Sequence, residues 1–320
     1  MKAIVVRGFG GSDVMSLEEI PTPEPGAAQV LVRIEAAGVN PVDTYIRSGI
    51  HAVRPNLPYT PGKDAAGVVE KTGGSVKEVK PGERVFLSGA VTGTYAEFAL
   101  CEAGQFHRLP DNVSFEEGAG VFVPYATAFR ALFQKAKGRK GETVLVHGAS
   151  GGVGLASIQW AKNAGLKVIG TAGSDEGKEL VKDQGADLVF DHSADNYLQK
   201  IREATGGSGV EIILEMLANV NLEKDFDILK MFGRITVIGN RGSLDFNPRL
   251  AMTKDASIFG MSLFNAPADE MLEINENIFK GLSEGFLKPV VGSRIPLAEA
   301  ARAHRNVIEN KAFGKIVLIP

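Results

Sequence analysis

The chain has 320 residues, of which 44% are hydrophobic and 23% are charged, as in an ordinary globular protein. This length predicts about two domains with large cores and excludes an intrinsically disordered chain. The 35 Lys and Arg against 38 Asp and Glu leave a net charge of −3. We therefore expect no basic surface that binds nucleic acid or anionic lipid without sequence preference. The only cysteine, Cys101, excludes an internal disulfide and a zinc site made of several thiolates.

The N-terminal segment, MKAIVVRGFGG, has an apolar core that is too short for a signal peptide. No later run of 18 apolar residues could span a bilayer. We therefore expect a cytosolic protein without a membrane segment.

Residues 1–123 are predicted to form a β-rich domain. Short strands are expected at KAIVV, QVLVRIEAAGV, AAGVVEKTG, ERVFLSG and TYAEFAL. Pro-Gly and Gly-Gly pairs separate them, for example at Pro25-Gly26 and Gly73-Gly74. Such pairs are typical of tight turns between strands.

A different pattern begins near Pro124. A helix is expected over Tyr125–Ala136, and strands then alternate with amphipathic helices. This alternation predicts a doubly wound parallel sheet, because parallel strands need crossover connections. The expected strands are Thr143–His147, Lys167–Thr171, Leu188–Asp191, Val210–Glu215 and Arg234–Ile238, with a further edge strand at Ser257–Phe264.

The last part of the chain predicts two helices, the second over 298–309, and a closing strand at Lys315–Ile319. We therefore expect an α/β fold in which a nucleotide-binding domain, residues 124–266, interrupts the β-rich domain. Residues 267–320 are expected to return to the β-rich domain.

The strongest functional signal is the run TVLVHGASGGVGLASIQWAK, residues 143–162. Gly148, Gly151 and Gly154 follow a buried strand and precede a helix. This spacing provides a tight turn, a close backbone approach to a diphosphate, and close packing of helix on strand. The helix start offers unpaired N–H groups and a positive dipole end to the diphosphate, and Ser150 adds a hydroxyl donor. In this context the glycines predict dinucleotide binding rather than a turn that only packs tightly.

The end of the second predicted strand favours NADPH over NADH. An NAD site usually has an acidic residue there, which holds the ribose 2′-OH. Here the strand ends in the small residues 170–174, which leave room for a 2′-phosphate. Ser174, Lys178 and His192 are the expected partners of that phosphate. The acidic pair at 175–176 lies close by and argues in the other direction.

Several segments resemble one known family. They are GETVLVHGASGGVGLASIQWAK (Gly141–Lys162), GVNPVDTYIRSG (Gly38–Gly49), LPYTPGKDAAGVVE (Leu57–Glu70), EMLANVN (Glu215–Asn221) and LKPVVGS (Leu287–Ser293). The resemblance is to quinone oxidoreductases of the zeta-crystallin type, in the medium-chain dehydrogenase/reductase superfamily, and extends over essentially the whole chain. It implies a GroES-like catalytic domain, a Rossmann domain that binds NADPH, and an active-site cleft between them. It also implies a cytosolic homo-oligomer, a tetramer or dimer, with the strand near Ser257–Phe264 at a subunit contact.

The chain departs from the zinc-dependent relatives at their ligand positions. Those relatives carry Cys at the position of Asn40 and His-Glu at the positions of Lys63-Asp64. An amide, an ammonium and one carboxylate do not form a tetrahedral zinc site of nitrogen and sulfur ligands. We therefore expect an enzyme without metal, to which alcohol oxidation is unsuited.

Four residues are candidates for the site of the electron acceptor. Asn40 is an amide donor, or a cap of the turn before Pro41. By resemblance, Tyr45 lies against the nicotinamide or its ribose, and the alternative is a core tyrosine. Tyr59 stacks on a quinone or packs beneath Pro58 and Pro61. Thr127 matches a threonine that contacts the nicotinamide in relatives, and its alternative is a place on a helix surface.

The resemblance also implies further contacts to the cofactor. They lie in the glycine turn and after the later strands of the predicted sheet: Tyr45, Ser150, Gly151, Gly152, Val153, Gly173, Ser174, Lys178, His192, Asn221, Ile238, Gly239, Asn240, Arg241, Met261, Ser262 and Leu263.

The remaining histidines and two other residues are expected to have structural roles. His51, His107 and His304 share no metal-ligand spacing and are expected to be solvated or capping residues. Trp160 and Cys101 are expected in the core, the latter as an inert thiol, and His147 is expected to be a core or turn residue.

Two other functions remain open. Reduction of an enone or 2-alkenal would use the same fold but would depend more on a proton donor, for which Tyr45 or Tyr59 would serve. A structural crystallin role or binding of AU-rich RNA belongs to a different class, and the net charge of −3 does not support RNA binding.

Overall fold

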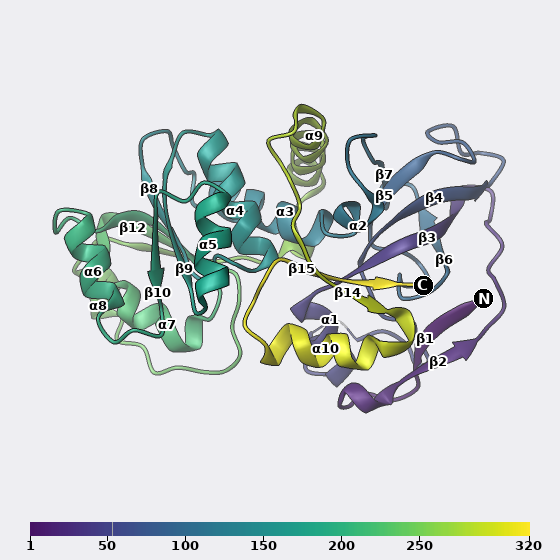
Figure 1. Cartoon of the computed structure of the whole chain (residues 1–320), viewed down its shortest axis with the longest axis horizontal. Helices are drawn as coiled ribbons and strands as arrows, with labels where there is room; N and C mark the ends of the chain where they lie inside the picture. Colours follow the sequence, from purple (N-terminus) through teal and green to yellow (C-terminus); the bar gives the residue numbers. More distant parts are fainter. Residues whose placement is uncertain (53) are drawn as a thin grey trace. The chain divides into compact units, whose positions relative to one another are not determined.

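The computed structural model describes residues 1–52 and 54–320, and the chain divides into two compact units (Figure 1). Unit 1 consists of residues 1–123, 279–310 and 314–320, and unit 2 consists of residues 124–278 and 311–313. The α/β fold class predicted from the sequence is confirmed: one unit is β-rich and the other contains a parallel sheet with helices.

Unit 1 is built on a seven-stranded sheet in the order β14-β15-β3-β4-β5-β7, with β6 paired to β3, and on the hairpin β1-β2. Its long central strand β3 is mostly apolar and buried along most of its length, and it pairs with β4, β6 and β15. The strands are β1 (Lys2–Val6), β2 (Met15–Glu19), β3 (Gln29–Val39), β4 (Asp64–Thr72), β5 (Arg84–Ser88), β6 (Phe98–Glu102), β7 (Phe106–Arg108), β14 (Val291–Pro296) and β15 (Lys315–Ile319). The helices are α1 (Pro41–Ser48), α2 (Phe115–Gly118) and α10 (Ala300–Glu309).

The core of unit 1 contains the chain's only cysteine. Cys101 lies on β6 and is fully buried among apolar side chains. Burial raises the pKa of its thiol to about 12, so the thiol remains protonated at neutral pH. The expectation of a buried, inert thiol is confirmed.

Unit 2 contains a six-stranded sheet in the order β10-β9-β8-β11-β12-β13, and every adjacent pair is parallel. The chain runs from β8 outward to β10 and then crosses to β11 on the other side of β8. This reversal makes the carboxyl ends of β8 and β11 the usual ligand position in such a sheet. The strands are β8 (Thr143–Val146), β9 (Lys167–Ala172), β10 (Leu188–Asp191), β11 (Val210–Glu215), β12 (Leu229–Val237) and β13 (Ser257–Gly260).

Helices cover both faces of this sheet (Figure 1). Side chains along β9 point alternately to the two faces of the sheet, so neighbouring residues show which helices cover each face. Ile169 packs with apolar side chains of α6 and α7. A Cβ on Gly170 would meet Val181 of α5, on the other face, at 2.6 Å. The helices are α3 (Phe122–Phe129), continued by a π-helical segment at Arg130–Lys135, α4 (Gly152–Asn163), α5 (Asp175–Asp183), α6 (Tyr197–Ala204), α7 (Ala218–Asp225), α8 (Arg249–Met252) and α9 (Ala268–Glu284).

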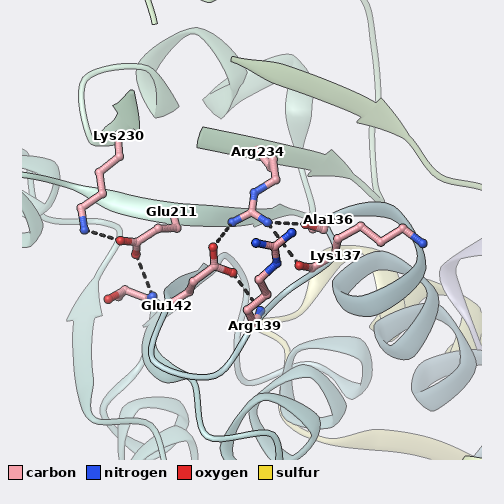
Figure 2. A network of polar contacts seen from close by, with 8 residues as sticks. Ala136, Lys137, Arg139, Glu142, Glu211, Lys230 and Arg234 are labelled. Atoms are coloured by element: carbon pink, nitrogen blue, oxygen red, sulfur yellow. Dashed lines mark hydrogen bonds and ion pairs between the residues drawn. The ribbon is translucent and has the colours of Figure 1, made fainter. Parts of the chain in front are cut away.

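A polar network joins the amino-terminal ends of three strands of unit 2 (Figure 2). Glu211 on β11 accepts hydrogen bonds from Lys230 of β12 and from the backbone N–H of Thr143 at the start of β8, the latter at 2.8 Å. Arg234 donates to Glu142 at 2.5 Å and to the carbonyl of Ala136. The network lies at the amino-terminal ends of these strands, whereas the glycine turn follows the carboxyl end of β8. Its role is therefore structural.

The main segment of unit 2 ends at Ile278, later than residue 266, where the sequence pattern predicted its end. The first part of α9, up to Ile278, belongs to unit 2. Two contacts explain this: Arg130 lies 3.1 Å from the carboxylate of Glu270, and Gln134 donates to the Glu273 carboxylate at 2.8 Å. These polar groups on α9 gave no signal in the hydrophobic pattern.

Candidate active site and cofactor site

The glycine turn joins β8 to α4 in unit 2. Gly148 has φ +55°, a conformation that favours glycine. At Gly154 a Cβ would lie 2.6 Å from the Ala149 Cα and from the Gly148 carbonyl oxygen. The first glycine therefore makes the turn, and the last lets α4 approach the backbone of the turn.

The N-terminus of α4 is open to an anion. Gly151 is its N-cap, and no side chain of the described residues caps the helix. No acidic residue lies in its first turn. In most helices a side-chain oxygen satisfies one of these N–H groups, so this helix start fits a bound diphosphate.

A small cluster of residues lies where β9 and β10 end, in addition to the glycine turn and the start of α4. A Cβ on Gly173 would lie 2.7 Å from His192 Nε2, and Lys311 donates to the Gly173 carbonyl at 2.6 Å. These three residues therefore gather at one place, next to the end of β9. Lys311 is absent from the sequence-based prediction, because it is more than one hundred residues away along the chain and no motif marks it.

Two of the three residues predicted to bind a 2′-phosphate, Ser174 and Lys178, have protein partners. Ser174 caps α5, its hydroxyl accepting from the Gly177 N–H at 3.1 Å. Lys178 lies 2.8 Å from Asp175 and 3.5 Å from Asp191. Its charge is therefore partly balanced by two carboxylates.

The remaining predicted cofactor contacts lie at the carboxyl ends of β11, β12 and β13. Asn221 donates to Glu215 at 3.1 Å. Asn240 accepts from the Asn219 N–H, and the Arg241 N–H donates to the Asn219 side chain, each at 3.0 Å. At Gly239 a Cβ would lie 2.2 Å from the Met216 carbonyl. The contacts Ile238, Met261, Ser262 and Leu263 lie in the same loops, after β12 and β13.

Beneath the glycine turn lies a fully buried cluster of titratable groups, His147, Glu215 and Asp225. His147 Nε2 lies 2.9 Å from Asp225 and 3.5 Å from Glu215. One carboxylate oxygen of each acid has no hydrogen-bond partner among the described residues. Burial, opposed by His147 and reinforced by Asp225, raises the pKa of Glu215 to about 7. Burial lowers the pKa of His147, but Asp225 and Glu215 outweigh it and raise the pKa. The expectation that His147 is a core residue is confirmed.

The predicted acceptor residues are divided between the units. Asn40, Tyr45 and Tyr59 belong to unit 1, and Thr127 belongs to unit 2. Thr127 is buried within α3, so its alternative as a helix-surface residue is wrong. Tyr45 lies half-buried on α1.

The side chain of Asn40 belongs to a buried polar group that the sequence did not predict. Asn40 precedes α1. Its side-chain NH₂ group donates a hydrogen bond to Asp64 at 3.0 Å, and its side-chain oxygen accepts one from Lys315 at 2.5 Å. Lys315 also donates to Asp64 at 2.7 Å. Asp64 is the first residue of β4 and Lys315 the first of β15, so three separate segments form this group.

A cavity of about 580 Å³ lies in unit 1. This volume is within the ordinary range of small-molecule sites. Tyr59 lines it, and the Tyr59 hydroxyl is buried without a hydrogen-bond partner among the described residues. Burial raises the pKa of Tyr59 to about 12, and the negative charge of Asp43 contributes to this increase to a lesser extent. The hydroxyl therefore keeps its proton. Other lining residues are Val5, Arg7, Ile20, Asp43, Ile46, Pro58, Thr60, Lys63, Val91 and Thr92.

The expectation that His304 is a solvated or capping residue is wrong. Only 1% of His304 is exposed, and its ring lies 3.2 Å from the Tyr95 hydroxyl and 3.4 Å from Arg47. Burial, together with Arg47, lowers the pKa of His304 to about 3. Its charged neighbours in the sequence hid the apolar side of α10, which packs in the core of unit 1.

Two family models match the chain. One is the alcohol dehydrogenase GroES-like domain, at residues 26–131, and the other is zinc-binding dehydrogenase, at residues 152–278. With the parallel sheet, the glycine turn and the β-rich unit, they define the chain as a medium-chain dehydrogenase/reductase. Among the described residues, no helix is both long and apolar enough to cross a membrane.

The similarity to individual proteins is closer. The quinone oxidoreductase of Rattus norvegicus is 49% identical over 100% of this chain and 98% of its own length. A structure of the Escherichia coli quinone oxidoreductase complexed with NADPH matches with a TM-score of 0.91 at 30% identity, covering 100% of both chains. A mycobacterial protein complexed with NADPH matches with the same TM-score at 33% identity and the same coverage. The chain belongs to the quinone oxidoreductase family, as its sequence motifs predicted.

Proposed function

We propose that the protein reduces quinones to hydroquinones with NADPH. The observation that carries the cofactor half is the uncapped N-terminus of α4 behind the glycine turn. The names of its relatives carry the acceptor half. The overall reaction consumes one NADPH, one quinone and one proton, and yields NADP⁺ and hydroquinone. Bound NADPH would supply the hydride.

In this proposal the residues of the chain bind and orient NADPH and donate hydrogen bonds to the acceptor. Backbone N–H groups at 151–153 hold the diphosphate, and Gly173, His192, Lys178 and Lys311 surround the adenosine end. Asn40 and the protonated Tyr59 donate hydrogen bonds to the oxygens of the acceptor, on which negative charge develops. A quinone accepts electrons readily, so these donors suffice without strong acid catalysis.

The test is a comparison of acceptors and cofactors. Steady-state assays with ortho- and para-quinones should consume NADPH much faster than NADH. Turnover of a small enone in the same assay tests the second candidate, reduction of a carbon–carbon double bond. Tyr59 favours that candidate as the proton donor, because it lines the cavity and its hydroxyl has no hydrogen-bond partner in the part of the chain that the structure describes. Enone turnover that exceeds quinone turnover would replace the first proposal by the second.

We also propose that no metal takes part. Lys315 donates to both Asn40 and Asp64, two of the three positions that correspond to zinc ligands. An ammonium that occupies these oxygens repels a second cation. Elemental analysis of the purified protein should find no stoichiometric zinc.

The preference for NADPH gives a prediction about two lysines. Removing Lys178 or Lys311 by substitution with alanine should weaken NADPH binding about 10- to 150-fold and leave NADH nearly unchanged, because a charge-assisted hydrogen bond to the 2′-phosphate is lost. Titration calorimetry with both nucleotides measures this. Lys182→Ala, on the exposed side of the same helix α5, is the matched control. Equal loss for NADH and NADPH would contradict the role in specificity, and an unchanged NADPH constant would leave His192 as the partner.

A homo-oligomer, expected from the sequence, belongs to the same proposal. Strand β13 is the edge of the unit 2 sheet, and exposed apolar side chains lie on it and near it: Ile258 on the strand, Phe264 after it, and Phe232 and Met252 before it. Unpaired edges of this kind are ready to pair with a second copy. The size of the assembly, a dimer or a tetramer, and a cytosolic location stay predictions. RNA binding stays an alternative that the net charge of −3 does not support.

The proposed contact is tested by Ile258→Lys. A buried, unpaired ammonium at the centre of the contact should dissociate the assembly, and light scattering coupled to size-exclusion chromatography gives the mass. Lys280→Glu, on exposed α9 surface, should not change the mass. A lysine variant of unchanged mass would place the contact elsewhere.

A further inference from the structure

Unit 1 contains a lysine in a position where lysine is rarely found. Lys315 is 5% exposed, and its partners Asn40 and Asp64 are 3% and 0% exposed. Lysine is almost never fully buried unless it is paired. Desolvating this ammonium costs free energy that its contacts with Asn40 and Asp64 must offset.

The chain makes room for the stem of this side chain with two glycines. A Cβ on Gly38 of β3 would lie 2.8 Å from Lys315 Cε, and one on Gly120 would lie 3.4 Å from Lys315 Cγ. The slot between these backbone segments directs the ammonium to Asn40 and Asp64.

The hydrogen bonds fix which way the Asn40 amide points. An ammonium has only donors, so the Asn40 Oδ1 must face Lys315, at 2.5 Å. The amide nitrogen then donates one hydrogen to Asp64 Oδ2 at 3.0 Å. The other Asp64 oxygen accepts from the Val123 N–H at 3.0 Å, which holds the carboxylate in place. For the second hydrogen of Asn40 Nδ2, no acceptor is recorded among the described residues.

We propose that Lys315 is a positioning residue that locks the Asn40 amide so that its remaining N–H donates to the oxygen of the electron acceptor. This inference rests on the proposed quinone reduction. Without Lys315, the carboxylate of Asp64 still attracts the NH₂ end of Asn40. The carbonyl end loses its charged donor and keeps only the backbone N–H of Asp43, in the capping box of α1, among the described residues. The amide then rotates, and the donor is lost for part of the time.

The test is a double-mutant cycle of Lys315→Met and Asn40→Ala, with quinone kcat, the NADPH dissociation constant and thermal stability measured for each variant. Losing one donor to a developing oxyanion typically lowers kcat by about 10²- to 10³-fold. We expect both single variants to lose kcat and the double variant to be no slower than Asn40→Ala. NADPH binding should stay within about twofold of wild type. Multiplicative losses, or an unchanged kcat in Lys315→Met, would overturn the proposal.

A second variant pair covers the case in which Lys315→Met fails to fold because Asp64 is left unpaired. Asp64→Asn removes that charge, and an amide at position 64 accepts from the NH₂ end of Asn40 or donates to its carbonyl end. Lys315→Met in the Asp64→Asn background should therefore fold and turn over more slowly than Asp64→Asn alone. Equal turnover of these two variants would also overturn the proposal.

An independent measurement separates this proposal from the proposed function. In ¹⁵N-asparagine-labelled protein, the NH₂ signal of Asn40 is the one that disappears in Asn40→Ala. We expect its hydrogens to exchange slowly in wild type and quickly in Lys315→Met, whether or not a quinone is reduced. Identical exchange in both proteins would disprove the locking. Slow exchange in a wild type that reduces no quinone would refute the proposed function alone.

Discussion

Gly154→Ala should destabilise the protein and abolish tight NADPH binding together. The added Cβ would lie 2.6 Å from backbone atoms of Gly148 and Ala149, and backbone cannot move aside as a flexible side chain can. Overpacking of this kind costs about 1–3 kcal/mol or more. The start of α4 must shift away from the turn, so the N–H groups that hold the diphosphate lose their alignment. We expect the NADPH dissociation constant to rise by more than about tenfold.

The chain contains a natural reporter for this experiment. Its only tryptophan, Trp160, lies on α4 itself and is 3% exposed. Trp160 fluorescence in urea gives the free energy of unfolding, and its quenching by NADPH gives the affinity. Gly242→Ala is the control, because a Cβ there would make only ordinary contacts with Asn219, at 3.6 Å. An alanine at 154 that leaves both quantities unchanged would show that the helix does not depend on this close approach.

Glu215→Gln should change how stability depends on pH. The pKa of Glu215 is raised from 4.5 to about 7, so the folded state holds its proton more tightly than the unfolded state. The stabilisation is therefore complete below pH 4.5 and is lost as the pH rises to about 7, by an amount on the order of 3 kcal/mol. Glutamine cannot titrate and keeps the carbonyl that accepts from Leu217 and Asn221. The variant should gain stability relative to wild type as the pH rises through this range.

Glu211 provides a control of opposite sign on the same strand. Burial raises its pKa, but hydrogen bonds from Lys230 and the Thr143 N–H outweigh burial and lower it. Its stabilisation is present above pH 4.5 and is lost as the pH falls. Glu211→Gln should therefore lose stability relative to wild type at neutral pH and not in acid. Urea unfolding from pH 4 to 9 measures both variants, and parallel curves for Glu215→Gln and wild type would contradict the assignment.

Much of the fold could be predicted because its signals are local. Strands β3, β10, β11 and β15 begin and end at the residues expected from their apolar runs. The glycine turn was predicted because a phosphate cradle needs small residues at fixed spacing. Helix α1 and strand β2 were not predicted: α1 is short and polar on one side, and β2 is largely exposed, so neither carries a clear period.

The polar parts of the site were harder to predict, because they are assembled from distant segments. Asn40 and Tyr59 were singled out from the sequence. The structure adds Lys315 as a hydrogen-bond donor to the first and the Asp43 carboxylate as a charge that raises the pKa of the second. Lys311 next to Gly173 is a similar case. A hydrogen bond between residues hundreds of positions apart leaves no periodicity, so only folding reveals it.

The inertness of Cys101 has a practical consequence for studying the protein. Because this thiol is sealed in the β-sheet core and keeps its proton, maleimide dyes and spin labels should not modify the folded wild type. A cysteine introduced at any exposed position would then be the sole point of attachment, without first engineering a thiol-free background. Probes of this kind would allow movements of the two units to be followed in solution during turnover.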